Sequence, residues 1–210
     1  TNKVLKLLRA EAPIIGNPKT EDEVTTFSSS RNQDVDAVLC RTNGGVIARA
    51  AQAFEDRREV YIPGGVDELK SWVRDAELLL DGQPARPGEL MAFISWSEVE
   101  EFSNSADGGH LKVFTKLVND YGPRDLLGIL DRVLKEPGEE GEYLTISTTH
   151  KAKGLEWDSI QVSDDFLLYP DTQTGKTKVS AAQVRLLYVA MTRAKGYLAL
   201  PSGLIRGYQE

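Results

Sequence analysis

Short apolar runs alternate with a helical pattern near the start of the chain. Apolar residues predominate in DAVLC at 36–40 and REVYI at 58–62, and the segment 46–57 between them repeats its apolar positions every three or four residues. A strand, a helix and a strand at this spacing predict a βαβ unit and therefore a parallel sheet. Before this unit, residues 2–10 have the spacing of an amphipathic helix, and we expect a loop to follow.

The middle of the chain contains helical patterns with no strand signal between them. Helical spacing covers 66–80 and is broken by the Gly- and Pro-containing stretch GQPARPG at 82–88. Three further helical segments follow, at 89–103, 110–120 and 124–135. We therefore interpret 66–136 as a helical insertion within an α/β domain.

The alternation of strands and helices returns after the acidic linker EPGEEGE at 136–142. The predicted elements are strands at 143–148, 159–163 and 196–200, and a helix at 181–194. We expect an α/β fold in which residues 1–65 and 137–210 form one parallel sheet flanked by helices. Residues 66–136 then form a small helical subdomain inserted into it.

Composition and charge limit the function classes. The formal net charge is −7 over 210 residues, so binding to nucleic acid requires a local basic site. No apolar run approaches the length of a membrane span, and we expect no membrane partner. The single cysteine, Cys40, lies in an apolar run and is expected to be a buried thiol in a reducing compartment, here the cytoplasm with its nucleoid, or the nucleus. One cysteine and two histidines show no metal-ligand spacing, so we predict no metal site.

The tail of a phosphate-binding loop, TGKT, occurs at 174–177. The full motif needs a glycine five residues before Gly175, where this chain has Pro170. Proline has no N–H to offer a phosphate, so a solvated loop is the favoured interpretation. The acidic pair Asp164-Asp165 follows a predicted strand and is interpreted as turn or cap residues.

Three polar clusters follow predicted strands or helices. His150, Lys151 and Lys153 in THKAKGLEWD come after the strand 143–148, and they suit either phosphate binding or a solvated basic turn. Glu156 in the same stretch is a hydrogen-bond acceptor, for which a ribose hydroxyl is one natural partner.

The other two clusters contain arginines. Arg193 near the end of the helix 181–194 compensates the helix dipole or reaches a phosphate. Arg41, with Asn43, follows the strand 36–40. We expect all three clusters to lie at the same edge of the sheet, where parallel strands present their carboxyl ends to ligands.

These stretches resemble the motifs of a known family. THKAKGLEWD at 149–158 resembles motif V of the superfamily 1 DNA helicases of the UvrD/Rep type, and RLLYVAMTRAK at 185–195 resembles motif VI. AVLCRTN at 37–43 resembles the segment sometimes called motif IVa. The resemblance implies a RecA-like second motor domain, 2A, with 66–136 in the place of a short domain 2B. The form of motif V is closest to the F-box DNA helicase branch.

The resemblance implies a nucleotide site made by three residues. Arg193 matches the motif VI arginine that reaches the γ-phosphate and is the expected catalytic residue. Glu156 matches the glutamate that contacts the nucleotide sugar, and Gly154 allows close backbone approach. The implied cofactors are ATP and Mg²⁺, and the Mg²⁺ ligands are expected in the N-terminal motor domain 1A, which precedes Thr1.

The resemblance also implies a DNA site. Arg41 and Asn43 match positions that contact the single strand, while His150 and Lys153 match motif V positions near the DNA and the domain interface. The expected partners are single-stranded and duplex DNA, together with domain 1A of the same protein.

The leading hypothesis is the C-terminal half of an ATP-dependent DNA helicase that translocates along a single strand and unwinds duplex DNA. We expect the chain alone to hydrolyse no ATP. One alternative is a non-hydrolysing module that binds nucleic acid or protein. Another is an independent enzyme that uses TGKT as a phosphate-binding loop.

Overall fold

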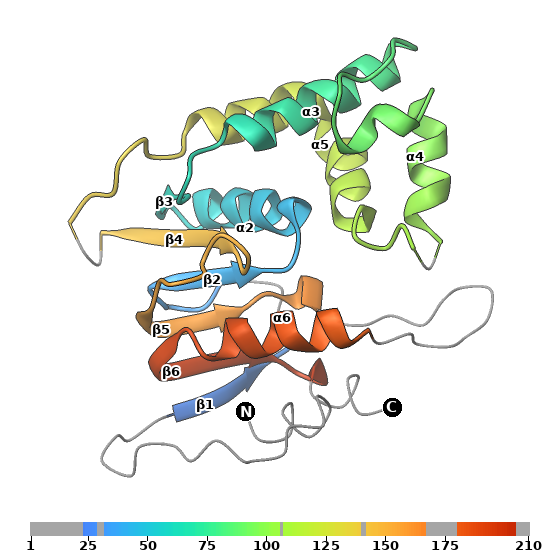
Figure 1. Ribbon diagram of the computed structural model, residues 1–210. Helices are drawn as coiled ribbons and strands as arrows, with labels where there is room; N and C mark the ends of the chain where they lie inside the picture. Colours follow the sequence, from blue (N-terminus) through green and yellow to red (C-terminus); the bar gives the residue numbers. More distant parts are fainter. Residues whose placement is uncertain (1–22, 29–31, 106, 140–141, 167–179, 205–210) are drawn as a thin grey trace.

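Among the residues that the structure describes, six strands form one sheet in which all neighbours pair in parallel, in the order β1-β6-β5-β2-β4-β3 (Figure 1). The computed structural model describes residues 23–28, 32–105, 107–139, 142–166 and 180–204. The strands are β1 Glu23–Phe27, β2 Ala37–Cys40, β3 Glu59–Tyr61, β4 Tyr143–Thr148, β5 Trp157–Val162 and β6 Ala194–Pro201. The predicted α/β fold with a parallel sheet is confirmed.

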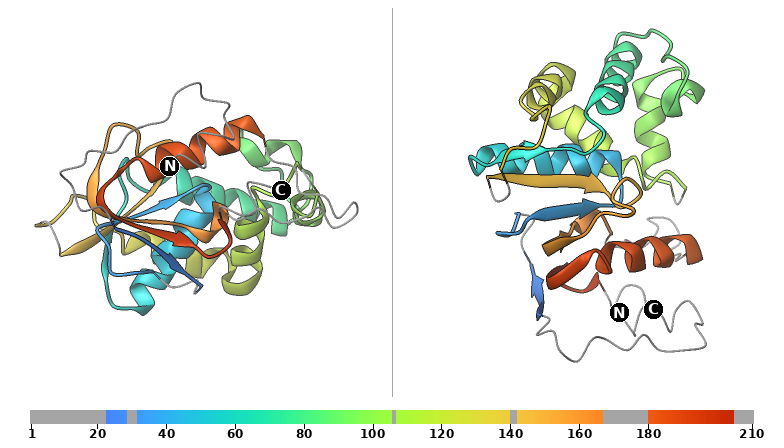
Figure 2. Two further views of the ribbon diagram at one scale, coloured as in Figure 1. Left: turned by 90° about the horizontal axis from the view of Figure 1, so that it is seen from below. Right: turned by 60° about the vertical axis from the view of Figure 1, so that its left-hand side comes forward.

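Helices cover both faces of the sheet. Helix α2, Asn43–Glu55, lies on one face and α6, Ala181–Met191, on the other (Figures 1 and 2). Successive side chains of a strand point to opposite faces, and β2 divides accordingly. Val38 and Cys40 pack into the core with α2, whereas Ala37 and Leu39 pack into the core with α6. All four residues of β2 are buried, as expected for a central strand covered on both sides.

Cys40 is a free, buried thiol, as predicted. Burial raises the pKa of this thiol well above its usual value, so it remains protonated within the core. In the part of the chain that the structure describes, no helix combines the length and the apolar character needed to cross a membrane.

The helical segment between β3 and β4 rises from the α2 face (Figure 1). It contains α3 Asp67–Leu80, the 3-10 helix η1 Glu89–Ala92, α4 Trp96–Ser103 and α5 Lys112–Asp131. Helix α5 is interrupted at Gly122, whose φ of 76° is not helical. The predicted helix 89–103 is wrong in one respect, because it is divided into η1 and α4. The predicted helices 110–120 and 124–135 correspond to the two parts of α5.

The core of this helical segment is continuous with the core beneath α2. Phe114 of α5 is fully buried, and its ring lies 4.9 Å from that of Trp72 and 6.1 Å from that of Trp96. A Cβ atom placed on Gly44 of α2 would lie 2.8 Å from the backbone nitrogen of Phe114. The glycine therefore permits α5 to approach the first turn of α2. The segment and the sheet are packed as one structure.

Strand β1 was not expected from the sequence, which predicted a loop there. Val24 is 63% exposed and only Phe27 is buried, so the strand lacks the apolar run that marked the others. It forms by pairing with β6, from Glu23 opposite Tyr197 to Phe27 opposite Pro201. Neighbouring β6 also begins earlier than predicted. The predicted helix 2–10 and the TGKT stretch lie outside the described residues.

We predict that Gly44→Ala destabilises the fold. The added methyl group would overlap the backbone of α5, which cannot move aside as a flexible side chain can, and overpacking of this kind costs about 1–3 kcal/mol. The control is Gly128→Ala in α5, where a Cβ would meet no atom within 4 Å. Alanine is the better helix former by up to about 1 kcal/mol, so this control should be neutral or stabilising. Urea unfolding of both variants measures the difference, and equal free energies of unfolding would contradict the close approach.

Candidate functional site

The parallel strands give the sheet two chemically different edges. Arg41 and Thr149 follow the carboxyl ends of β2 and β4, whereas Glu156 and Arg193 precede the amino ends of β5 and β6. Strand β5 has six residues at about 3.3 Å each, so the two edges lie about 20 Å apart. The expectation that all three polar clusters share one edge is therefore wrong. The stretch 149–156 crosses the sheet, because a parallel strand must be entered from the opposite edge.

At the carboxyl edge, hydrogen bonds join the ends of β2 and β4. The backbone N–H and the hydroxyl of Thr149 both donate to the carbonyl oxygen of Cys40, at 2.9 and 3.2 Å. This junction brings two predicted DNA-binding residues, Arg41 and His150, to neighbouring positions, since each follows one of the bonded residues. His150 is exposed and Arg41 is half-buried.

The carboxylate of Asp165 fixes the turn from β2 into α2. It accepts hydrogen bonds from the backbone N–H groups of Arg41 and Thr42 and from the Thr42 hydroxyl, at 2.9–3.0 Å. The Thr42 hydroxyl in turn accepts from the N–H of Gly45 at 2.9 Å and so caps α2. A Cβ on Gly45 would lie 2.1 Å from the Asp165 carboxylate, so a larger residue here would displace that carboxylate from its hydrogen bonds.

The two acids after β5 have different partners. Burial of the carboxyl group raises the pKa of Asp165, and the N–H groups of Arg41 and Thr42 oppose that shift. Asp164 forms an ion pair with the buried guanidinium of Arg49. Both acids lie in the 3-10 helix η2, Asp164–Phe166, after β5, and their partners belong to the turn into α2 and to α2 itself.

A glutamate of the helical segment reaches the same edge. Glu68, in the first turn of α3, accepts a hydrogen bond from Asn43 Nδ2 at 3.4 Å and another from Lys151 Nζ at 2.8 Å. The hydrogen bond from Lys151 lowers the pKa of Glu68. Sequence analysis missed this residue, because Glu68 is 25 positions from Asn43 and lies in a helix predicted for the insertion.

The amino edge holds the predicted nucleotide residues. The N–H of Trp157 donates to the carbonyl oxygen of Arg193 at 3.0 Å, and Trp157 pairs with Ala194 in the sheet register. Glu156 and Arg193, which precede these two residues, are thereby brought together with 4.0 Å between Oε1 and Nη1. Gly154 has a φ of 90°, which favours glycine, and a Cβ there would meet no atom within 4 Å. Lys153, exposed beside it, is a predicted DNA-binding residue that lies further along the crossing loop than His150.

Arg193 lies just beyond α6, which ends at Met191, rather than in the last helical turn. Its guanidinium donates to the carbonyl oxygens of Val189 and Leu155 and to the Thr192 hydroxyl, at 3.2–3.4 Å. The contact with Val189 is the helix-end compensation considered as one alternative. The Arg193 side chain is 20% exposed, whereas the Glu156 side chain is 56% exposed. The glutamate is therefore open to a further donor, and the arginine is held beside it.

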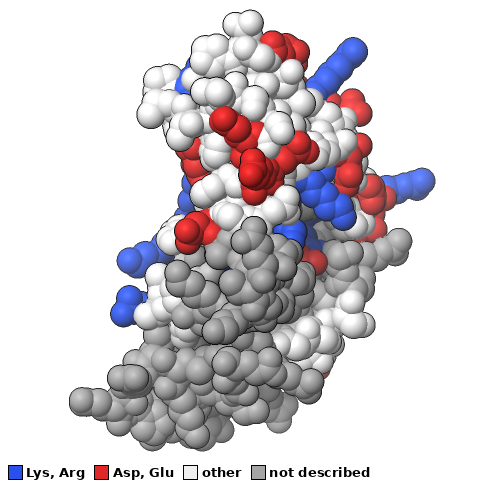
Figure 3. Space-filling view, turned by 90° about the vertical axis from the view of Figure 1, so that its right-hand side faces the viewer, with Lys and Arg blue, Asp and Glu red and all other residues white. Residues whose placement is uncertain are grey.

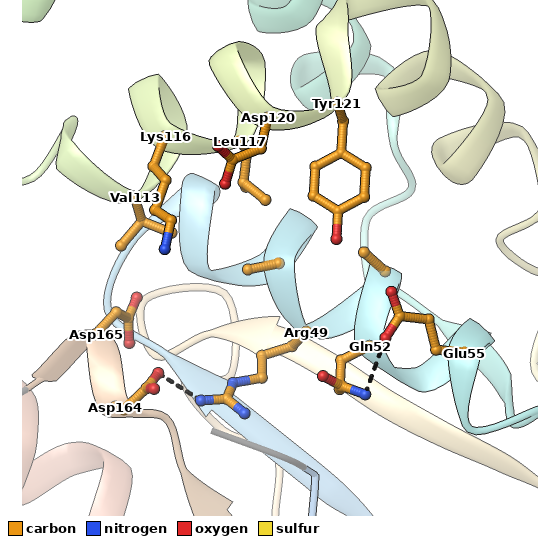
Figure 4. A pocket seen from close by; sticks show the side chains of 12 residues that line it. Arg49, Gln52, Glu55, Val113, Lys116, Leu117, Asp120, Tyr121, Asp164 and Asp165 are labelled. Carbon is orange, nitrogen blue, oxygen red and sulfur yellow. Dashed lines mark hydrogen bonds and ion pairs between the residues drawn. The ribbon is translucent and has the colours of Figure 1, made fainter. Parts of the chain in front are cut away.

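A cavity of about 400 Å³ lies between α2 and α5, near the acids that follow β5 (Figure 4). Lys116, Asp120 and Glu55 line it together with the Tyr121 ring, so both signs of charge face the same space. No sequence pattern indicated this cavity, because its walls come from three segments that are far apart in the chain. The space-filling view likewise shows Lys and Arg close to Asp and Glu, so the face drawn there is not uniformly basic (Figure 3). The described residues contain no group of side chains that could hold a metal ion.

Comparisons with known proteins agree on one relationship. Residues 90–202 match the family described as UvrD-like helicase C-terminal domain. The F-box DNA helicase protein 1 of Schizosaccharomyces pombe is 30% identical over 148 residues, which cover 65% of this chain and 17% of that protein. The F-box DNA helicase 1 of Gallus gallus is 29% identical over 195 residues, which cover 80% of this chain and 19% of that protein. The chain thus spans less than a fifth of the length of these relatives.

We predict that Asp165→Ala lowers the free energy of unfolding by about 2–4 kcal/mol. The substitution leaves the N–H groups of Arg41 and Thr42 without their acceptor, and each buried unpaired donor costs about 1–3 kcal/mol. The control is Asp158→Ala, which removes a largely exposed carboxylate paired with Lys195 and should change stability by less than about 0.5 kcal/mol. Chemical denaturation compares the two. A small effect at both positions would mean that water replaces the Asp165 carboxylate.

Proposed function

Because the chain belongs to the family of UvrD-like helicase C-terminal domains, we propose that it is the C-terminal motor half of an ATP-dependent DNA helicase. Its similarity to two F-box DNA helicases favours that branch of the family. The observation that carries the proposal is the separation of two sets of residues on opposite edges of one sheet. Glu156 and Arg193 meet at the amino edge, while Arg41, Asn43 and His150 lie at the carboxyl edge. A translocating motor needs two such sites, one for the nucleotide and one for the strand.

At the amino edge, ATP is bound in a cleft completed by domain 1A of the same protein. The Arg193 guanidinium exchanges its contacts of 3.2–3.4 Å for the γ-phosphate, and these long hydrogen bonds are weak enough to be replaced. Its planar, permanently charged fork suits phosphate oxygens and stabilises the charge that spreads over them during transfer. Glu156 accepts a ribose hydroxyl, which its exposure permits. The left-handed turn at Gly154 keeps the backbone clear beside the nucleotide.

Mg²⁺ neutralises charge on the β- and γ-phosphates in reactions of this kind. We place its ligands in domain 1A rather than in this chain. At the amino edge, the Glu156 carboxylate lies 4.0 Å from the Arg193 guanidinium. Asp36 accepts hydrogen bonds from Ser159, and Asp158 pairs with Lys195. An arginine beside carboxylates that already have partners suits phosphate and ribose better than a cation that demands several oxygen ligands.

At the carboxyl edge, single-stranded DNA is bound without regard to sequence. Arg41 contacts a phosphate, Asn43 and His150 donate hydrogen bonds nearby, and Lys153 adds a second cation along the loop. Asp165 holds the backbone of Arg41 in place, so the side chain projects from a fixed point. Duplex unwinding follows from movement of this strand when the nucleotide cleft closes. A non-hydrolysing binding module remains the alternative, and it would hold if no phosphate-binding loop is encoded upstream of Thr1.

We predict that Arg193→Ala in the protein that contains both motor halves reduces ATP turnover about 10³- to 10⁵-fold. DNA binding should change less than about twofold, because Arg193 lies at the other edge of the sheet. The matched control is Lys195→Ala, two positions away, whose exposed side chain pairs with Asp158. ATP hydrolysis with saturating single-stranded DNA distinguishes the two variants.

Full ATP turnover by Arg193→Ala would exclude its role at the γ-phosphate. We also expect the 210-residue chain alone to hydrolyse no ATP. Turnover by this chain that is lost in Lys176→Ala would favour the independent enzyme with a TGKT loop.

The expected effect of Arg41→Ala is the reverse. Affinity for single-stranded DNA should fall, and the slope of log affinity against log salt should become shallower by about 0.7, the loss of one phosphate contact. Nucleotide binding should be unchanged, because Glu156 and Arg193 are about 20 Å away along β5. Fluorescence anisotropy of labelled single-stranded DNA at several salt concentrations measures the DNA affinity and its salt slope. An unchanged salt slope would place the strand elsewhere on the molecule.

A further inference from the structure

We propose that Lys151 is a further phosphate contact of the carboxyl edge, and that Glu68 holds it in reserve until DNA displaces the glutamate. This inference rests on the proposed DNA-binding function of that edge. Lys151 lies between His150 and Lys153 in the sequence. Its ammonium group donates a hydrogen bond to a carboxylate of the protein itself, that of Glu68. The carboxylate that engages it belongs to α3, at the start of the helical segment.

Glu68 connects three parts of the chain through one carboxylate. Oε2 accepts from Lys151 Nζ at 2.8 Å, a short, charge-assisted hydrogen bond. Oε1 accepts from Asn43 Nδ2 at 3.4 Å, so the glutamate also engages a residue expected to meet the strand. Lys151 lies in the turn that leaves β4, and Asn43 begins α2 directly after the turn that leaves β2; these two strands are neighbours in the sheet. A phosphate between these turns would meet the donors that Glu68 now occupies.

The exposure of the pair makes the exchange possible. The side chains of Lys151 and Glu68 are 34% and 57% exposed, so water screens their attraction. Exposed ion pairs contribute little to stability, and a phosphate can replace the carboxylate at small expense. The ammonium group would then contact an anion that belongs to DNA rather than to the protein. The negative charge of Glu68 also repels the phosphates of DNA bound near this edge. The affinity for DNA is therefore lower than it would be with the nearby cations and no Glu68 carboxylate.

The first test compares Glu68→Gln with Glu77→Gln. Glu77 is on the same helix, exposed and without a described side-chain partner, and it lies nine residues further along, or about 14 Å. Both changes remove one negative charge. We expect Glu68→Gln to bind single-stranded DNA about two- to fivefold more tightly than the unmodified chain, the equivalent of releasing one exposed ion pair. Its salt slope should also steepen, because Glu68, when displaced from Lys151 by DNA, takes up a cation that offsets the one released from the phosphate, and glutamine does not. Glu77→Gln should leave both unchanged.

A double-mutant cycle then identifies the cation that Glu68 releases. Lys151→Ala should weaken binding less than about twofold in the unmodified chain, where Lys151 must first leave Glu68, and should remove the whole gain in the Glu68→Gln background. Lys151→Arg in that background should retain the gain, because it keeps the charge. Urea unfolding of each variant checks that stability is unchanged.

Each other outcome overturns the inference. Equal affinities for Glu68→Gln and Glu77→Gln would show an ion pair that only joins α3 to the loop, and a gain that survives Lys151→Ala would show a general charge effect. Chemical acetylation tests the inference in the chain without any substitution. Bound DNA should slow the acetylation of Lys151 more than that of exposed Lys135. Equal protection of the two lysines would also overturn it. No DNA binding by any variant would reject the proposed function itself.

Discussion

Parallel pairing of the strands is the constraint on which both candidate sites depend. Every strand runs in the same direction, so all carboxyl ends face one side of the sheet and all amino ends face the other. Each connection must therefore return across the sheet before the next strand begins. Polar residues that follow a strand, such as Arg41, are separated by a strand's length from those that precede one, such as Glu156. The two-site arrangement is a consequence of topology, and the side chains only give each edge its chemistry.

At the carboxyl edge the protein fills its own anion site. A helix N-terminus presents free N–H groups and a partial positive charge, which suit an external anion. Here Asp165 accepts from the turn into α2, while Thr42 caps the N–H of Gly45. Gly45 leaves room for this carboxylate. In the proposed DNA site, recognition of a phosphate at this edge is therefore left to side chains rather than to the helix N-terminus.

The elements whose own residues are mostly buried were predictable from the sequence. Strand β2 is a continuous apolar run and α2 repeats its apolar positions at helical spacing, because both elements are largely buried. Strand β1 gave no such signal, since an edge strand is stabilised mainly by backbone pairing with its neighbour. The division of 89–103 did have a local cause, because Ser95 accepts from the N–H of Glu98 and starts a new helix. That Ser-x-x-Glu pattern is a capping signal that could have been used.

The sequence identifies candidate residues for the site, but it does not predict how they are arranged. The stretch that resembles motif V forms the loop that crosses from the carboxyl edge to the amino edge. The order of its polar residues does not show which of them lie at the carboxyl edge and which at the amino edge. Hydrogen bonds settle this, since Thr149 is tied to Cys40 and Trp157 to Arg193. Glu68 had no sequence signal, because its partner Lys151 is 83 positions away. Long-range pairs between exposed side chains depend on how the helical segment packs, which local patterns do not encode.

Strand β5 is the element that touches both edges. Its first residue follows Glu156 and bonds to Arg193, and the residues after its end hold Arg41 through Asp165. It is paired on both sides, with β2 and β6, so it cannot slide without breaking hydrogen bonds in two registers at once. The two edges therefore move together as parts of a rigid sheet. For the proposed motor, the stepwise movement must then occur between this chain and the domain that completes the nucleotide cleft, and closure of that cleft at the amino edge displaces the carboxyl edge, with its DNA contacts, as one body.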